Sequence, residues 1–367
     1  MTEPHSQSDA TPRAPVGWFK RHRRRLLLWL RLAVALGLMG FVLSLVIRDR
    51  EQLAHVNWEW IPLAWGLMLV STVVKAFRWS LLVRQSHMNI PFRRLLGTYL
   101  VGGFFSTILP TSFGGDAVRA VDTAVETGRP ADSTSSVVIE RGIGLLAIIG
   151  AGSLFTLFLH PGKVPQGFVL LVHVMFAAGI LGLVMLRLGW FLEPFAALLT
   201  RLKMVRLVVK VRGLQAAMTE HLGRPGVLLL MLILSIIANA LTMGATYIVL
   251  SAVTDPIPLA AFVPMIALST TAELLPISIA ALGVKESAYI FFLGLAGVGQ
   301  TEAGVIAIIM RVLSWLLAMV GGVVYMVRTL RARPDKMPPR QPPPTGGRRD
   351  RRFITPEDAD STEVVGC

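Results

Sequence analysis

The chain has 367 residues, of which 53% are hydrophobic and only 16% are charged, and its formal net charge is +14. A soluble domain carries about 25% charged residues, so this composition argues against a soluble globular protein. The basic residues flank apolar segments, which argues against nucleic-acid binding and is typical of the cytoplasmic, anionic face of a membrane. The one cysteine, Cys367, excludes an internal disulfide.

Residues 1–25 are polar and basic, and we expect them to form a disordered tail that precedes the membrane part of the chain. About 20 apolar residues are needed to cross a bilayer. The runs that reach this length are Leu26–Ile47, Trp60–Val83, Ser135–Leu159, Gly167–Leu188, Gly226–Ser251 and Ala303–Val327. The predicted fold class is therefore an all-α polytopic membrane protein. Residues 331–367 are rich in Pro, Arg and Asp and are predicted to form a second disordered tail.

Two shorter apolar runs, Leu95–Pro110 and Ala260–Pro276, each stop at a Leu-Pro-x-Ser break. Proline and glycine free backbone groups that lipid cannot satisfy, so such breaks must be buried in protein or line a cavity. Interrupted segments at corresponding places in two halves indicate the binding site of a transporter. After the breaks we expect two short helices, Asp116–Thr127 with Asp116 as its N-cap and Lys285–Val298.

The positive-inside rule gives a topology in which both termini are cytoplasmic. The basic residues between Arg201 and Arg212 stay inside if the first broken segment enters from the cytoplasm and turns back, and the second then enters from outside. Each half, 26–160 and 161–330, then has three spans and one broken re-entrant segment, and the second half is inverted relative to the first. The alternative is eight full spans, under which the broken segments cross the membrane. Residues 187–224 are predicted to form one or two amphipathic helices at the cytoplasmic surface.

Several ionisable residues fall inside apolar segments, where each costs at least about 2.5 kcal/mol and therefore faces a cavity or a partner. The candidate substrate-path residues, which include the breaks themselves, are Lys75, Arg78, Pro110, Ser112, Gly114, Gly115, Asp116, Arg119, Glu140, Arg141, Glu273, Pro276, Ser278, Gly283, Lys285, Glu286 and Arg311.

Structural alternatives remain open for these residues. Lys75 is close enough to a helix end to extend its ammonium group to the interface. Glu140 and Arg141 fit a structural salt bridge to another helix, and Asp116 and Arg119 fit a pair within one helix. Glu273 fits either a pair with a basic residue or a proton-binding site.

The motifs together resemble a known family. They are KxxRW (Lys75–Trp79), LPxSxGGDxxR (Leu109–Arg119), an acidic-Arg pair followed by Gly (Glu140–Gly142), LPISxxxLGVKE (Leu275–Glu286) and Arg311. Over about residues 25–330 the chain resembles the flippase-like family named for the transmembrane region of lysylphosphatidylglycerol synthase. In the name-giving proteins a cytosolic domain aminoacylates phosphatidylglycerol, and the membrane region translocates the product.

The resemblance implies lipid translocation without synthesis, because the chain ends in a short polar tail. It also implies that the lipid headgroup path is lined by Arg78, Asp116, Arg119, Arg141, Glu286 and Arg311. Two departures from the family pattern, Ala280-Ala281 in place of glycines and Glu140 in place of Asp, leave the headgroup open.

We therefore expect a multi-pass protein of the cell (inner) membrane that is not an enzyme and uses no cofactor and no metal. It would move an anionic or aminoacylated (glyco)phospholipid or a polyprenyl-linked lipid between leaflets. Its expected partners are membrane lipids, a separate lipid-synthesising enzyme and further copies of the chain, with no nucleic acid. The alternatives are a membrane-embedded glycosyl- or phosphotransferase and a non-transporting scaffold. The sequence contains no HExxH or Walker motif.

Overall fold

The computed structural model describes residues 56–109, 113–158, 165–190, 192–202, 204–272 and 283–331, together with Gly40, Ser44 and Ala54. Most of the predicted span Leu26–Ile47 and both predicted tails lie outside the described residues. The chain divides into two compact units, Met1–Met326 and Val327–Cys367. Apart from the last residues of the final helix, the helices described below belong to the first unit.

Five helices in the described ranges are long and apolar enough to cross a membrane. They are α3 (Ile61–Gln85, preceded by the short 3-10 helix η1, Trp58–Trp60), α6 (Pro130–Thr156), α7 (Gln166–Arg187), α10 (Pro225–Val253) and α13 (Gln300–Arg331). They confirm five of the predicted spans. Helix α6 begins five residues earlier than the predicted Ser135, because Pro130 suits the first turn of a helix, and Ser133 in the added turn is buried.

Each predicted break separates two short helices that pack against each other. Helices α4 (Phe92–Ile108) and α5 (Gly114–Thr127) form the first pair, and α11 (Leu259–Ala272) and α12 (Val284–Leu295) form the second. Helix α4 has 17 residues, which at 1.5 Å per residue is about 26 Å, shorter than the roughly 30 Å hydrocarbon core of a bilayer. The residues at the breaks themselves, 110–112 and 273–282, lie outside the described residues.

The predicted N-cap of the first short helix was wrong. Helix α5 begins at Gly114, its N-cap is Phe113, and Asp116 is the third residue of the first turn. The carboxylate of Asp116 accepts hydrogen bonds from arginine side chains, which explains why it does not cap the helix. Helix α12 likewise begins and ends earlier than the predicted Lys285–Val298, and Gly297 follows it with a positive φ of 94°.

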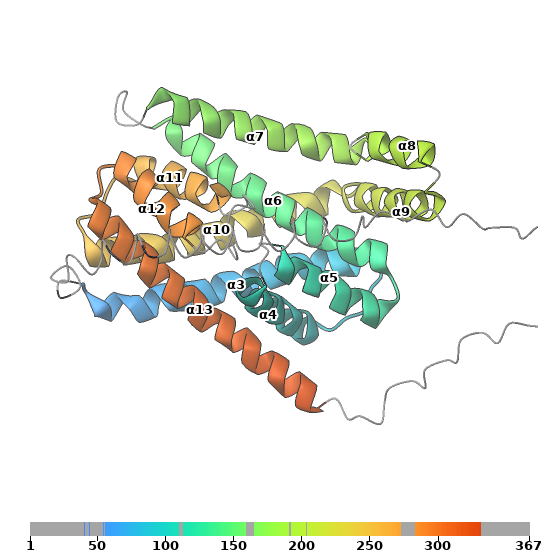
Figure 1. Ribbon diagram of the computed structural model, residues 1–367, viewed down its shortest axis with the longest axis horizontal. Helices are drawn as coiled ribbons and strands as arrows, with labels where there is room; N and C mark the ends of the chain where they lie inside the picture. Colours follow the sequence, from blue (N-terminus) through green and yellow to red (C-terminus); the bar gives the residue numbers. More distant parts are fainter. Residues whose placement is uncertain are drawn as a thin grey trace, which may run out of the picture. The chain divides into compact units, whose positions relative to one another are not determined.

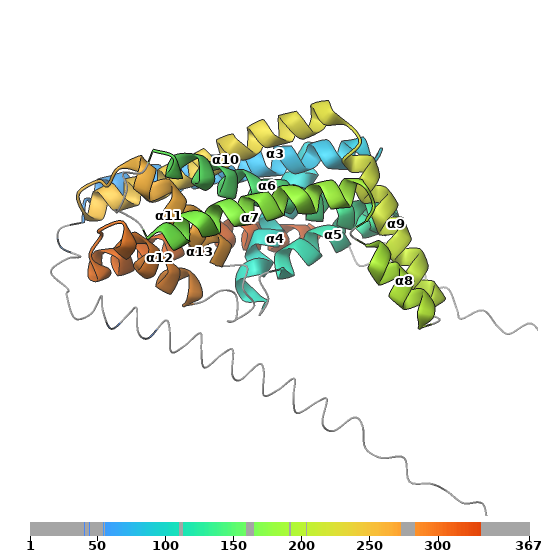
Figure 2. The same ribbon diagram turned by 90° about the horizontal axis from the view of Figure 1, so that it is seen from above.

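Helix α6 lies at the centre of the first unit, where it packs against α3, α5, α7, α10 and α11 (Figure 1). Helices α3 and α10 lie side by side along their length (Figures 1 and 2). The largest hydrophobic cluster joins α3, α10, α11, α12 and α13. The charged side chains that lie on α6 are therefore surrounded by protein on several sides.

Glycine permits a close approach between α4 and α5. A Cβ at Gly115 would lie 2.8 Å from the backbone carbonyl carbon of Gly102, and it would also contact the Ser106 hydroxyl. Backbone atoms cannot move away as a flexible side chain can. The first turn of α5 is therefore held directly against the backbone of α4.

This contact predicts opposite effects for two Gly→Ala substitutions. Gly115→Ala should lower the melting temperature of the detergent-solubilised protein, because overpacking costs about 1–3 kcal/mol. Gly103→Ala is the matched control, since no atom lies within 4 Å of its Cβ position, and it should leave the melting temperature unchanged or raise it. Fluorescence-detected size-exclusion chromatography after heating gives both values, and equal melting of the two variants would contradict the close approach.

Candidate functional site

Among the described residues of the first half, the most buried acidic side chain is shared between two arginines. Glu140 of α6 accepts a hydrogen bond from Arg78 Nη2 of α3 through Oε1, and from Arg119 Nη2 of α5 through Oε2 at 3.1 Å. No more than 5% of any of the three side chains is exposed. One carboxylate thus joins three helices inside the bundle.

A second carboxylate extends this arrangement toward a more open edge. Arg119 Nη1 donates to Asp116 Oδ1 at 3.3 Å, and Arg141 Nη1 donates to Asp116 Oδ2. The Arg141 side chain is 31% exposed and that of Asp116 is 17% exposed. Arg78, Asp116, Arg119, Glu140 and Arg141 are called the arginine network below. Three arginines and two carboxylates give this network a net charge of +1 when all five are ionised.

Aromatic rings fix two of the guanidinium groups. The Arg119 guanidinium carbon lies 4.4 Å from the ring centroid of Trp79 and 4.2 Å from that of Tyr99. The Arg141 guanidinium carbon lies 5.0 Å from the Phe113 ring centroid. Such contacts attract a cation to the ring face and hold it more strongly where water is excluded. Arg119 is therefore clamped between two helices, while Arg141 contacts a ring that is itself half exposed.

Small side chains leave room for the arginines. A Cβ at Gly102 would lie 2.7 Å from Arg119 Cγ, and a Cβ at Gly144 would lie 3.0 Å from Arg78 Nη2. Arg78 Nη1 also donates to Ser235 Oγ of α10 at 2.6 Å. In the described part of the chain, the buried Nε groups of Arg78, Arg119 and Arg141 have no hydrogen-bond partner. The network therefore retains donor capacity beyond its five members.

Lys75 lies one turn before Arg78 but makes a different contact. Its Nζ donates to Thr242 Oγ1 of α10 at 3.2 Å, and Ser71 also bonds Thr242. Lys75 thus belongs to a polar contact between α3 and α10.

The second half contains a related ion pair. Arg311 of α13 donates from Nε to Glu286 Oε1 of α12, and Glu286 Oε2 accepts the backbone N–H of Gly283 at 2.8 Å. Glu286 is fully buried. Gly283 has a φ of 78°, a conformation that glycine adopts without a Cβ penalty. Lys285 Nζ lies 5.9 Å from the Tyr289 ring centroid.

The two ion pairs have the same spacing along the chain. Asp116 and Arg141 are 25 residues apart, and so are Glu286 and Arg311. Each acidic residue is the third residue of a short helix that follows a break, and each arginine lies in the long helix after it.

Most of the predicted residues that the structure describes lie in one of two groups. The structure brings Arg78, Asp116, Arg119, Glu140 and Arg141 together, and it joins Gly283, Glu286 and Arg311 at a separate place. Gly114 and Gly115 form the first turn of α5 beside the first group. The predicted residues that lie outside the described part of the chain are Pro110, Ser112, Glu273, Pro276 and Ser278.

Residues 28–322 match the family described as the lysylphosphatidylglycerol synthase TM region. The chain belongs to this family. Both groups of ionic side chains lie inside the matched region of the lysylphosphatidylglycerol synthase TM family. Neither the curated proteins nor the solved structures that were compared with the chain gave a significant match.

Sequence reasoning did not single out the residues that hold the network in place. Tyr99 gives no sequence signal for its contact with Arg119, because an aromatic residue in an apolar run is ordinary. Trp79 was visible as part of KxxRW, and Gly102 and Ser235 as small residues within apolar runs. Small residues of this kind usually mark helix packing, so only the folded chain assigns them to the arginines.

The shared carboxylate predicts a large loss of stability for Glu140→Ala. This change leaves Arg78 and Arg119 buried without their common partner, and breaking a buried ion pair costs about 3–5 kcal/mol. Glu126→Ala is the control, because Glu126 pairs with Arg94 at an exposed site and such pairs contribute about 0–1 kcal/mol. Unfolding of both variants by titration with SDS measures the difference. Similar unfolding midpoints would show that Glu140 does not carry this role.

Proposed function

We propose that this multi-pass membrane protein is a lipid flippase that binds the phosphate of an anionic or aminoacylated phospholipid or of a related lipid. The observation that carries the proposal is the arginine network, which has a net positive charge, is buried between membrane helices and opens at Arg141. Ionisable groups inside a membrane bundle are expensive and mark substrate or ion pathways by default.

The network assigns different roles to its members. Arg141 is the most exposed arginine, and its guanidinium can present two donors to phosphate oxygens. In the structure Asp116 forms a salt bridge with Arg141, so its carboxylate competes with a phosphate for the Arg141 guanidinium. Arg78, Arg119 and Glu140 hold α3, α5 and α6 in register so that Arg141 and Asp116 stay at the edge. The acyl chains of the substrate remain in lipid while the headgroup passes the network.

We further propose that the chain is built from two inverted halves. The support is the repeated order of a broken apolar segment, a short helix and a long helix, with the acid and arginine 25 residues apart in both copies. In this arrangement α4–α5 enters from one side of the membrane and α11–α12 from the other. The ion pair Glu286–Arg311 is then the second half's equivalent of Asp116–Arg141.

The charges at the helix ends support cytoplasmic termini in the cell (inner) membrane. Arg84 ends α3, Arg187 ends α7 and Arg224 precedes α10, and these helix ends are joined through contacts with α9. At the other end, Asn57 bonds the Ala252 carbonyl and Thr254 bonds Glu302. The positive-inside rule then assigns the end with Arg84 to the cytoplasm.

The flippase proposal predicts that Arg141→Ala and Arg311→Ala abolish lipid translocation. Folded protein is isolated by size-exclusion chromatography before reconstitution, because Arg311→Ala leaves the buried Glu286 carboxylate without this partner. The purified protein is reconstituted in proteoliposomes with fluorescent phosphatidylglycerol, lysyl-phosphatidylglycerol, phosphatidylcholine or a polyprenyl phosphate, and dithionite quenching follows leaflet exchange. Arg84→Ala is the matched control, since Arg84 is exposed at the end of α3. We expect exchange of one lipid class to be fast for the wild type and the control and to fall at least tenfold in the two variants.

Three other outcomes would contradict the proposal. Exchange that is equally fast in every variant would indicate that lipids cross at defects around the protein and not along a path lined by these arginines. No exchange of any lipid by the wild type would also favour a scaffold. A chemically altered lipid recovered from the vesicles would favour a membrane-embedded transferase.

The topology is tested by cysteine labelling. Cys367→Ser removes the native thiol, and Arg84→Cys or Asp255→Cys then introduces a single one. In intact cells, a membrane-impermeant maleimide should label Asp255→Cys and should label Arg84→Cys only after the cells are opened. The reverse pattern would invert the assignment, and labelling of both sites from outside would contradict a single orientation.

A further inference from the structure

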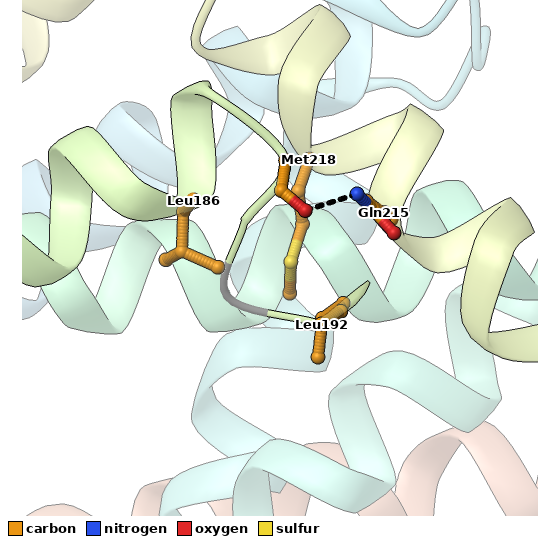
Figure 3. Close-up of a pocket in the computed structure, with 5 residues that line it drawn as sticks. Leu186, Leu192, Gln215 and Met218 are labelled. Atoms are coloured by element: carbon orange, nitrogen blue, oxygen red, sulfur yellow. Dashed lines mark hydrogen bonds between the residues drawn. The ribbon is translucent and has the colours of Figure 1, made fainter. Parts of the chain in front are cut away.

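The two helices between α7 and α10 form a hairpin that is attached firmly to the bundle. Helix α8 (Glu193–Arg201) packs against α9 (Val205–His221). At the corner after α7, Gln215 Nε2 donates to the Gly189 carbonyl, and Gly189 has a φ of 77° that permits the turn (Figure 3). The hollow lined there by Leu186, Leu192 and Met218 is too small to admit a water molecule. The corner is therefore packed and offers no ligand pocket.

The C-terminal end of α9 is inserted between two helices of the arginine network. His221 is buried, with Nε2 2.8 Å from Ser86 Oγ and Nδ1 3.2 Å from Ser135 Oγ. Gln85 Nε2 donates to the carbonyls of Glu220 and His221, both at 3.2 Å. These contacts fix α9 to the end of α3 and the start of α6, so the hairpin has a defined position on the bundle.

The hairpin and its tip expose several large apolar side chains. Leu198 and Leu202 are four residues apart in sequence, as are Val205 and Val209, and such spacing places side chains on one helix face. Val205 is 70% exposed and Val209 is 66% exposed. The exposed large apolar residues of the hairpin and its corner are Trp190, Phe195, Leu198, Leu202, Met204, Val205, Leu207 and Val209. Apolar patches of this size on a protein surface mark an interaction site.

Basic residues accompany this apolar surface. Residues 187–224 contain seven Lys and Arg and two Glu, which gives a formal charge of +5. Arg201, Lys210 and Arg212 are exposed beside the apolar side chains. Apolar and basic side chains on the same helices are typical of segments that lie in the interface of an anionic bilayer.

Exposed apolar side chains are also present on α7 up to the corner that precedes the hairpin. Leu181, Val184 and Leu188 are exposed along the last turns of α7 and at its end, directly before the corner. Beyond that corner, α8 and α9 turn away from the direction of α7 at the end of the bundle (Figure 2). Lipid that covers the exposed apolar side chains at the end of α7 would therefore lie next to the corner that leads into the hairpin.

We propose that the apolar tip of the α8–α9 hairpin is buried in the headgroup–acyl boundary of an anionic leaflet, with Arg201, Lys210 and Arg212 at the lipid phosphates. The hairpin thereby fixes the depth of the network helices, because α9 is bonded to α3 and α6. This inference stands whether or not the protein transports lipid.

Spin-label depth measurements on the full chain in nanodiscs test this proposal. In a Cys367→Ser background, nitroxide labels are placed at Leu198→Cys, Val209→Cys and Thr200→Cys. Thr200 is the control, because it is exposed and lies about 200° around α8 from Leu198. In discs of phosphatidylglycerol and phosphatidylethanolamine, labels at 198 and 209 should be accessible to oxygen and several-fold less accessible to an aqueous nickel chelate than the label at 200.

Two outcomes overturn the proposal. High chelate accessibility at all three sites would place the hairpin in water. Exclusion of both reagents at 198 and 209 would mean that protein, such as a second copy of the chain, covers the tip. The charge is tested with Lys210→Gln/Arg212→Gln, which should reduce the depth of the label at 198 in anionic discs and leave it unchanged in phosphatidylcholine discs. If the label at 198 lies at the same depth with and without these charges, the basic residues do not hold the hairpin at the lipid phosphates.

Discussion

A single carboxylate organises the first half of this protein. Glu140 lies inside a membrane bundle and accepts hydrogen bonds from two arginines on two other helices. In a medium of low polarity, neither arginine tolerates the loss of this partner, because an uncompensated buried charge costs several kcal/mol. The relative positions of α3, α5 and α6 are therefore coupled through one side chain. Because α6 also packs against α7, α9, α10 and α11, a shift of α6 would displace these helices as well.

A buried ion pair seldom stabilises a protein more than well-packed apolar residues of the same volume would. The stability of this bundle consequently gives no reason to keep five ionised side chains in it. A requirement for charge at this depth gives such a reason, and the proposed flippase function supplies it, because the phosphate of a transported lipid leaves water as it passes between leaflets. The clamp of Trp79 and Tyr99 around Arg119 then serves to keep one arginine in place while Arg141, at the edge, remains accessible.

The sequence predicted the five described spans and the short helices beside each break, because long apolar runs and Leu-Pro-x-Ser interruptions follow directly from the chemistry of the bilayer. It also identified the charged residues of the network, since charges are conspicuous in apolar segments. Of the pairings it offered only Asp116–Arg119, one turn apart on the same helix, and the structure confirms that pair; it did not predict the pairs between helices. Glu140 bonds residues 62 and 21 positions away, and only the packing of helices sets those distances. The N-cap prediction was wrong for the same reason. Asp is a favoured N-cap residue, but the packing of α5 against α6 places Arg141 beside the Asp116 carboxylate.

The close contact between α4 and α5 at Gly115 determines how these helices respond to the membrane potential. Since the two helices touch through their backbones, they cannot slide past each other without a clash, and any rearrangement displaces them as one body. That body carries Asp116 and Arg119 together, whose opposite charges cancel. A membrane voltage does about 2.3 kcal/mol of work per 100 mV on one elementary charge that crosses the bilayer, but almost none on such a neutral pair. Movement of this pair across the membrane would accordingly be electroneutral, so under the proposed function the membrane potential acts on the charge of the lipid and not on this pair.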